Sequence, residues 1–295
     1  MKDLTLIGVA SGWGARDRRC EDGPDRLLAT MPLSCLASEG HAPPSYEILR
    51  AAPPSTERDV TAAVVEINQR LASAVRRCVS ADYFPIVIGG DHSCAVGTWS
   101  GVYGAVAERG TLGLLWVDAH MDSHVPQTSP SGALHGMPLA CLLGHGLNEL
   151  THLAGPAAKL NPAHVCLLGV RSFEAGEAAL LAALGVRVIL MDEVAWRGFA
   201  TVWREAVARV SGASAGYGIT LDLDALDPRD APGVGTPSPE GIGADELVRA
   251  LAATRYDQNC LALEIAEYNP HLDHDQMTLR LLRRILCAVS AGADE

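Results

Sequence analysis

Short apolar runs recur along the chain, and a glycine, an aspartate or a proline lies at or near the end of each. Seven such runs lie at 4–10, 84–90, 112–120, 164–172, 186–192, 218–224 and 260–270. Nearly continuous apolar runs of four to eight residues are typical of strands that are covered on both faces. The pattern therefore predicts a mainly parallel sheet with helices on either side.

Amphipathic helical stretches separate these runs, notably at 59–79, 174–184, 201–210 and 244–254. Alternation of strand and helix is typical of the α/β class. We expect a three-layer αβα sandwich around a central, mainly parallel sheet of about eight strands. The chain has no repeat, low-complexity linker or charge block, which predicts one domain over 1–295. The segments at 43–54 and 123–133 are interpreted as loops.

Composition narrows the function classes. The chain has 295 residues and a formal charge of −12, whereas nucleic-acid binding needs a concentrated basic patch. The first residues do not have the pattern typical of a signal peptide, and no apolar stretch approaches the roughly 18 residues of a membrane span. Eight scattered cysteines without a CxxC pair indicate free thiols. We expect a cytoplasmic protein that binds a small molecule, and neither nucleic acid nor membrane.

Acidic and histidine residues follow the strand predicted at 112–117. Asp118, His120 and Asp122 form a D-x-H-x-D unit. If the extended backbone continues, positions i, i+2 and i+4 point to one face. The unit would then bring two carboxylates and an imidazole together at the carboxyl edge of the sheet, where ligands bind in open parallel sheets.

Two more polar groups follow predicted strands. Asp222 and Asp224 come after the apolar start of the run at 218–224, and His92 stands in the loop GGDHS. A single aspartate at a strand end usually caps a turn, but three such groups at one edge indicate a metal site. The four aspartates carry a charge of −4, which two divalent ions would balance. Carboxylate and imidazole ligands without cysteine favour Mn²⁺, with Fe, Co or Ni as competitors and Zn²⁺ less favoured.

The motifs GGDHS, DAHMD, SPSGALHGMP, DLDALDP and EIAEYNP stand over 89–270 in an order that resembles the arginase (ureohydrolase) family. The N-terminal segment GVASGWG…EDGP is similar more weakly. The thirteen-residue spacing from Asp122 to His135 resembles arginases more than agmatinases. The resemblance implies a binuclear-manganese hydrolase that cleaves the guanidinium group of L-arginine or a close analogue to urea and an amine, ornithine in the case of arginine.

The resemblance also implies how two Mn²⁺ ions would share six ligands. One ion would be held by His92, Asp118, Asp122 and Asp222. The other would be held by Asp118, His120, Asp222 and Asp224, so that Asp118 and Asp222 bridge. A hydroxide between the two ions would be the nucleophile, because metals lower the pKa of bound water.

Three residues are expected to be catalytic by the same resemblance: His135, Glu267 and, as a ligand, Asp122. His135 matches the family's proton shuttle, a role that suits its titration range. Glu267 matches the carboxylate that pairs with the substrate guanidinium. Glu264 should face the other way and is interpreted as structural. Asp91 either orients a metal ligand or holds the turn.

The side chains expected around the part of the substrate away from the guanidinium differ in places from the family pattern. His124 stands where arginases have an asparagine, and the resemblance assigns substrate contacts to His124, Ser129, Ser131, Glu174 and Glu177. Ser172 replaces an aspartate of the family pattern. Nω-hydroxyarginine, agmatine or a guanidino acid therefore stay open beside arginine. The resemblance also implies a homo-oligomer, a trimer or hexamer.

Three other interpretations compete. A mononuclear-zinc deacetylase shares a D-x-H motif but does not need the paired Asp222 and Asp224. A non-catalytic homologue should lack a ligand, and all six are present. A nucleotide-binding α/β protein is indicated only by GVASGWG, which lacks the dinucleotide fingerprint.

Overall fold

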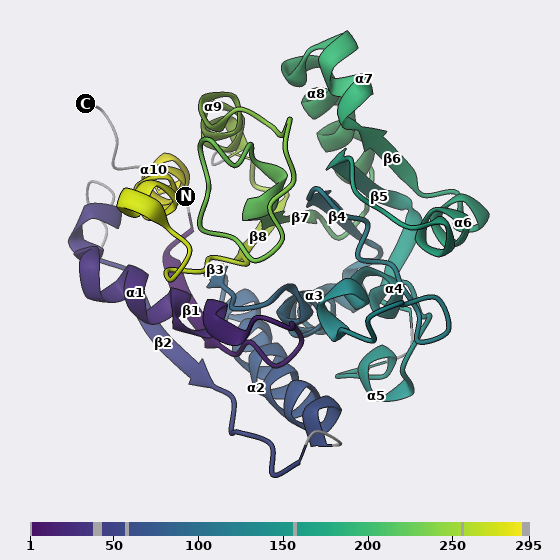
Figure 1. The fold of residues 1–295 in the computed structure, drawn as a ribbon, viewed down its shortest axis with the longest axis horizontal. Coiled ribbons are helices and arrows are strands. Elements are labelled where there is room, and N and C mark those ends of the chain that lie inside the picture. The colour runs from purple at the N-terminus through teal and green to yellow at the C-terminus, as the bar shows by residue number, and fades with distance from the viewer. Residues whose placement is uncertain (1, 38–42, 57–58, 156–157, 255–256, 291–295) are drawn as a thin grey trace.

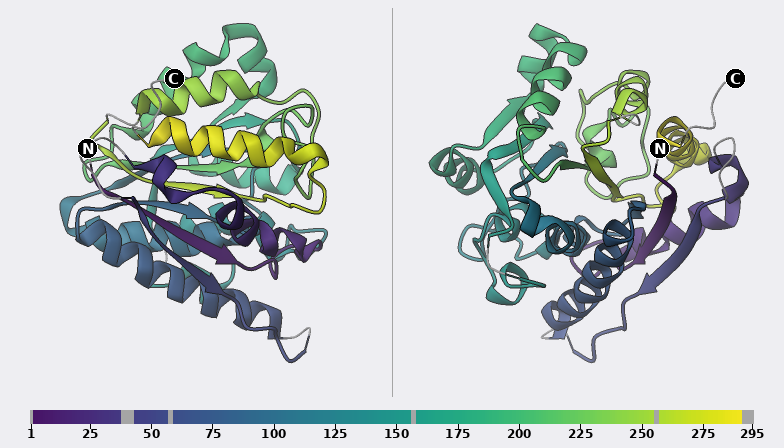
Figure 2. Two further views of the ribbon diagram at one scale, coloured as in Figure 1. Left: turned by 90° about the vertical axis from the view of Figure 1, so that its left-hand side faces the viewer. Right: turned by 180° about the vertical axis from the view of Figure 1, so that it is seen from behind.

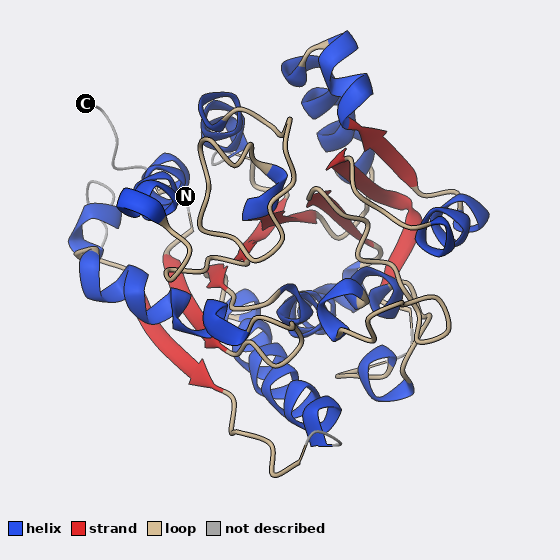
Figure 3. Ribbon diagram, in the orientation of Figure 1, coloured by secondary structure: helices blue, strands red, loops and turns tan. Residues whose placement is uncertain are grey.

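A computed structural model describes residues 2–37, 43–56, 59–155, 158–254 and 257–290. Eight strands form one sheet (Figures 1 and 3): β1 (Leu4–Ala10), β2 (Ser45–Arg50), β3 (Phe84–Ile88), β4 (Leu112–Val117), β5 (Leu160–Val170), β6 (Arg187–Leu190), β7 (Tyr217–Asp222) and β8 (Cys260–Ala266). Their order across the sheet is β2-β1-β3-β8-β7-β4-β5-β6. Every strand pair in this sheet is parallel, which confirms the predicted α/β sheet.

Helices cover both faces of the sheet. One face carries α1 (Gly23–Thr30), α8 (Phe199–Val210), α9 (Ala244–Thr254) and α10 (Met277–Val289). The other face carries α2 (Val60–Ser80), α3 (Ala95–Val106), α4 (Pro138–Leu142) and α6 (Ala175–Leu184). The short helices α5 (Asn148–Thr151) and α7 (Met191–Arg197) complete the α-helices of the described residues. The left view in Figure 2 shows α9 and α10 on one side of the strands and α2 on the other, so the three-layer prediction is confirmed.

The alternation of side chains along β4 explains why both faces need cover. Leu115 and Val117 point into the layer formed with α8, α9 and α10, whereas Leu114 and Trp116 point into the layer formed with α2 and α3. All four side chains are fully buried. Successive residues of a strand point to opposite faces, so a strand between two helical layers is apolar throughout.

The prediction of a loop over the whole of 43–54 was wrong. Residues 45–50 form β2, which pairs with β1 at the edge of the sheet. Its side chains are exposed or half-buried, and Tyr46 is 58 % exposed. An edge strand with one covered face needs no continuous apolar run, and the flanking prolines obscured it. The segment 123–133 contains no helix or strand, as expected.

The predicted helices lie close to their observed bounds. The stretch 59–79 corresponds to α2, 174–184 to α6, 201–210 to α8, and 244–254 to α9. Of the described helices, none is both long and apolar enough to cross a membrane.

Candidate metal centre and active site

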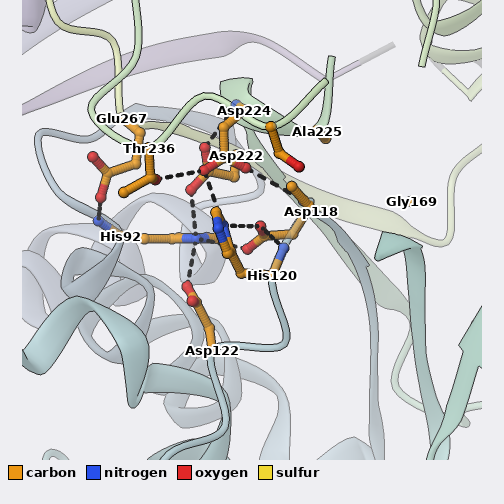
Figure 4. A network of polar contacts seen from close by, with 12 residues as sticks. His92, Asp118, His120, Asp122, Gly169, Asp222, Asp224, Ala225, Thr236 and Glu267 are labelled. Atoms are coloured by element: carbon orange, nitrogen blue, oxygen red, sulfur yellow. Dashed lines mark hydrogen bonds and ion pairs between the residues drawn. The ribbon is translucent and has the colours of Figure 1, made fainter. Parts of the chain in front are cut away.

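The six residues predicted as metal ligands meet at the carboxyl ends of three central strands. His92 lies in η4 (His92–Cys94) after β3, and Asp118, His120 and Asp122 follow β4. Asp222 ends β7, and Asp224 lies in η7 (Leu223–Ala225) directly after it. Figure 4 shows these side chains pointing toward one another from separate loops. The structure therefore brings together ligands that are up to 132 positions apart in the chain.

The distances define two overlapping groups. His92 Nδ1 lies 3.3 Å from Asp118 Oδ2, 3.0 Å from Asp122 Oδ2 and 3.2 Å from Asp222 Oδ2. His120 Nδ1 lies 3.5 Å from Asp118 Oδ1 and 3.1 Å from Asp224 Oδ2. His92, Asp118 and Asp222 can hold one ion, and Asp118, His120 and Asp224 can hold another. Asp118 belongs to both groups, as expected of a bridging ligand.

The buried carboxylates of this centre repel one another, and bound cations would reduce that repulsion. Burial, followed by repulsion from Asp224 and Asp118, raises the pKa of Asp222 well above its usual range. Burial and the charge of Asp118 raise the pKa of Asp122 to about 6. Burial lowers the pKa of His92, but the nearby carboxylates of Asp118, Asp122 and Asp222 outweigh it and raise that pKa. Without metal, a histidine proton therefore stands in for part of the positive charge that the carboxylates require.

His92 also tests whether the residues fit a metal ion. Its Nδ1 is buried and makes no hydrogen bond within the described part of the chain, although it faces three carboxylate oxygens. A buried nitrogen that faces three carboxylate oxygens needs a proton or a bound cation between itself and them. The donor set, two imidazoles and four carboxylates, suits a divalent transition metal.

The explanation of convergence by an extended backbone was wrong. β4 ends at Val117, and Asp118 Oδ1 accepts a hydrogen bond from the His120 N–H at 2.7 Å. Asp122 has a φ of 46°, in the left-handed region that non-glycine residues seldom adopt. The chain therefore turns back on itself to aim these three side chains, and strain at Asp122 is maintained by the surrounding packing.

Trp116, the fifth residue of β4, supports two ligands and was not identified from the sequence. Its ring stacks on the His92 ring with centroids 4.5 Å apart. Its Nε1–H donates to Asp118 Oδ2 at 2.8 Å. A tryptophan two residues before the D-x-H-x-D unit is the one signal that could have indicated this support.

Arg171 and Thr236 hold the Asp224 segment in place, and both were also missed. Thr236 Oγ1 donates to Asp224 Oδ2 at 3.0 Å. The Arg171 guanidinium donates to the carbonyl oxygens of Asp224 at 2.7 Å and Ser238 at 2.7 Å, with further bonds to Leu226 and Pro239. Burial lowers the pKa of Arg171. The Arg171 guanidinium thus provides hydrogen bonds to the carbonyl groups of these loops. It also places a positive charge near Asp224 and Asp118.

Glu267 and His135, the two predicted catalytic residues outside the ligand set, contact each other. Glu267 Oε1 lies 3.0 Å from His135 Nδ1 and accepts a hydrogen bond from the His92 N–H at 2.9 Å. Burial lowers the pKa of His135, but the hydrogen bond and charge of Glu267 outweigh it and raise that pKa to about 9. Glu267 is buried, whereas the side chain of His135 is 23 % exposed. The pair connects the buried centre to the solvent side.

The N-terminal loop holds His135 in place. The His135 N–H donates to the Gly14 carbonyl at 3.1 Å, and the Gly14 N–H donates to Asp91 Oδ2 at 2.9 Å. A Cβ on Gly14 would lie 2.3 Å from Asp91 Oδ1. Asp91 also accepts from the Ser93 N–H, so its contacts favour the turn role over orientation of a ligand side chain.

A cavity of about 240 Å³ opens above the ligands. His124, Ser131, Glu174 and Glu177 line it, together with Asp122, Asp222 and Asp224 from the centre. Ser129 is not among the lining residues, and its Oγ accepts from the Gly132 N–H at 3.0 Å. The cavity thus includes four of the five side chains predicted to contact the substrate.

His124 joins the two glutamates at the rim of this cavity. Its Nε2 lies 3.0 Å from Glu174 Oε2 and 3.4 Å from Glu177 Oε2, and its Nδ1 lies 3.1 Å from Thr128 Oγ1. Glu174 and Glu177 also form the capping box at the start of α6. Burial and the neighbouring Glu174 raise the pKa of Glu177 to about 8. The rim therefore carries two acidic side chains, and the imidazole of His124 lies against both of them.

Comparison with known proteins agrees with the motifs. The family model described as "Arginase family" matches residues 2–291. An arginase of Bacillus caldovelox is 38 % identical over 286 residues, which cover 94 % of each chain. A solved arginase structure from Bacillus subtilis aligns with a TM-score of 0.90 at 32 % identity, over 100 % of this chain and 99 % of the other. The native structure of the Bacillus caldovelox arginase aligns with a TM-score of 0.88 at 35 % identity, over 100 % and 99 %. The chain belongs to the arginase family.

Proposed function

We propose that this protein is a binuclear-manganese hydrolase that cleaves the guanidinium group of L-arginine, or of a close analogue, to urea and an amine. With arginine the amine is ornithine. The observation that carries the proposal is the convergence of two imidazoles and four carboxylates at one edge of the sheet, where His92 Nδ1 faces three of the carboxylates. Relatives named arginase, similar over nearly the whole chain, support it.

Two Mn²⁺ ions would share the six ligands. His92, Asp118, Asp122 and Asp222 would hold one ion, and Asp118, His120, Asp222 and Asp224 would hold the other. Ions held there would supply a water of lowered pKa as the nucleophile. The buried aspartates fix the ligand geometry, and Trp116 and Thr236 hold those aspartates in position.

Glu267 and His135 would act on the substrate itself. The Glu267 carboxylate can accept two parallel hydrogen bonds from a planar guanidinium, which orients the carbon to be attacked. Substrate binding would replace the present contact between Glu267 and His135. His135 Nδ1 could then deliver its proton to the departing amine, and its exposed edge could take up another from solvent.

His124, Ser129, Ser131, Glu174 and Glu177 would set the choice of guanidino compound. Glu174 and Glu177 can hold a substrate ammonium group, and Ser131 and His124 can donate to a carboxylate. Arginine carries both groups, agmatine carries the ammonium alone, and a guanidino acid carries the carboxylate alone. Nω-hydroxyarginine differs only at the reacting end, where Glu267 lies.

A urea-release assay on Mn²⁺-loaded protein tests the proposal with arginine, Nω-hydroxyarginine, agmatine and guanidino acids. We expect urea from at least one of them, with arginine or its hydroxylated form turned over fastest. Two bound Mn²⁺ per chain without urea from any compound would indicate a non-catalytic homologue. One zinc ion per chain together with amide cleavage would indicate a deacetylase instead.

We also propose that residues 1–295 act as one catalytic domain, in a homo-oligomer such as a trimer or hexamer. A cytoplasmic location is supported by the cysteines, because all eight are unpaired. Light scattering during gel filtration tests the oligomeric state. A monomer at micromolar concentration would contradict that part of the proposal.

A further inference from the structure

A row of polar and aromatic side chains crosses the sheet beneath the metal ligands. Trp116 on β4 pairs in register with Thr220 on β7, and Thr220 pairs in register with Glu264 on β8. All three side chains are fully buried. Register neighbours in a sheet point to the same face, so this row lies in the layer under α3. Glu264 therefore points away from the substrate side, where Glu267 lies.

Hydrogen bonds connect this row to the metal ligand His92. Thr220 Oγ1 donates to Glu264 Oε2 at 3.1 Å and lies 3.1 Å from His92 Nε2. The Cys94 thiol donates to Glu264 Oε1, with sulfur and oxygen 2.8 Å apart. A hydroxyl has one proton, and Thr220 gives it to Glu264, so Thr220 Oγ1 must accept from His92 Nε2–H. The Nδ1 lone pair of His92 would then be available to a metal ion held by the aspartates.

We propose that Glu264, acting through Thr220, is a positioning residue that fixes the tautomer and ring orientation of His92 so that Nδ1 faces the metal centre. This inference rests on the metal centre of the proposed function. The Glu264 carboxylate, at the end of this series of hydrogen bonds, can only accept. It therefore fixes the direction in which each hydrogen bond of the series is donated. Groups of this kind behind a metal-bound histidine hold its ring and increase its basicity.

The burial of Glu264 argues for this role over a simple link between strands. Two neutral groups, Cys94 and Thr220, donate to its oxygens. A buried carboxylate that receives hydrogen bonds only from neutral donors is costly. Positive charge at the metal centre, to which His92 and Thr220 connect Glu264, would offset that cost by electrostatic attraction. A link between β7 and β8 alone could be made at lower cost by two apolar side chains.

Thr220→Val is the first test, because it removes the hydroxyl and keeps the volume nearly constant. We expect the affinity for one of the two Mn²⁺ ions to fall by roughly 10- to 100-fold, as is typical when a partner of a metal ligand is lost. The affinity for the other ion should stay near that of the wild type. Equilibrium dialysis with Mn²⁺ alone measures both constants without any substrate.

Two matched variants separate the hydroxyl from the packing. Thr220→Ser keeps the hydroxyl and should hold Mn²⁺ within about threefold of the wild type. Thr98→Val makes the same change at a buried threonine of α3, whose hydroxyl donates to the Cys94 carbonyl. It should leave both Mn²⁺ constants unchanged. If Thr220→Val does not fold, Thr220→Ala removes the same hydroxyl without adding a methyl group.

Glu264→Gln tests the direction of the chain of hydrogen bonds. The amide can donate to Thr220, which lets the hydroxyl donate to His92 Nε2 and moves the ring proton to Nδ1. We expect a loss of Mn²⁺ affinity similar to that of Thr220→Val. At matched loading, the electron paramagnetic resonance spectrum of a coupled ion pair should give way to single-ion signals.

The outcomes separate this role from others. If both variants melt at lower temperature yet bind two Mn²⁺ ions with wild-type affinity, the row is structural and the inference is wrong. If the wild type binds two ions but releases no urea, the proposed function fails and the binding data still decide the role of Glu264. A wild type that binds no Mn²⁺ would overturn both.

Discussion

The metal centre and the rim of the cavity lie next to each other but are built differently. The ligands follow central strands of the sheet and are held from behind by Trp116, Thr220 and Arg171. The rim consists of a loop and the first turn of α6, and the side chain of Glu174 is 58 % exposed. The six residues of the centre lie in motifs that resemble the arginase family, whereas His124 at the rim stands where that resemblance predicts an asparagine. A rigid sheet edge thus maintains the reaction, and a loop on a helix end is free to change the substrate.

The largest effect should come from Asp118→Ala, because Asp118 belongs to both groups of ligands. Removing it also leaves the Trp116 Nε1–H without its acceptor and takes one carboxylate away from each of the two histidines. We expect loss of both metal ions and of all urea release. Elemental analysis after gel filtration measures the metal. Two ions per chain in this variant would show that the ligand assignment is wrong.

His135→Asn should slow turnover by about 10²- to 10⁴-fold, the usual range for a general acid or base. Both metal ions should remain, because His135 is not a ligand in the proposed scheme. Steady-state kinetics with arginine, paired with elemental analysis, gives both quantities. Normal turnover would count against proton transfer by this residue.

Glu267→Ala should lower kcat/KM, because it removes the carboxylate proposed to bind the substrate guanidinium. The loss of one partner of a buried charge pair costs about 2–5 kcal/mol, which is roughly a thirty- to several-thousand-fold fall in kcat/KM. The metal content should not change. Unchanged kinetics in this variant would remove Glu267 from the substrate site.

The His135–Glu267 pair should also give stability a pH dependence. The pKa of His135 is raised from 6.5 to about 9, so protonation is favoured by folding. This stabilisation is fully present below about pH 6.5 and is lost as the pH rises through about 9. We expect metal-free wild type to lose about 2 kcal/mol more than His135→Asn over this range. Urea denaturation at a series of pH values measures it, and parallel curves for the two proteins would contradict the pairing.

The smallest effect should lie at the rim. His124→Asn removes the ring held between Glu174 and Glu177 and restores the amide that arginases have. We expect the ratio of kcat/KM for arginine over agmatine to rise by roughly tenfold, a change typical of one contact in a substrate pocket. Metal content and turnover of the better substrate should change little. An unaltered ratio would mean that His124 does not select the substrate.

The sequence was informative wherever a feature is local. Apolar runs predicted the central strands, and the polar residues directly after them are the ones that meet at the candidate metal centre. β2 was not predicted, because this edge strand has exposed side chains such as Tyr46 and therefore no apolar run. α3 was not singled out because it is buried nearly all round, and a buried helix has no polar face to give it a period.

Features that depend on strand register could not be predicted in the same way. The pairing of Trp116, Thr220 and Glu264 joins positions far apart in the chain, and only the order of the strands brings them together. The positive φ of Asp122 likewise follows from packing, since aspartate itself prefers other conformations. Residues that position a ligand are therefore harder to find from sequence than the ligands they support.

The position of β8 has a consequence for synthesis of the protein. Although β8 is the last strand of the described residues, it lies in the middle of the sheet, between β2-β1-β3 on one side and β7-β4-β5-β6 on the other. His92 belongs to the first half and the four aspartates to the second. A nascent chain therefore has no complete site until its C-terminal strand has emerged and inserted. Metal ions bound by the proposed ligands would connect the two halves of the sheet and would stabilise the folded state by mass action.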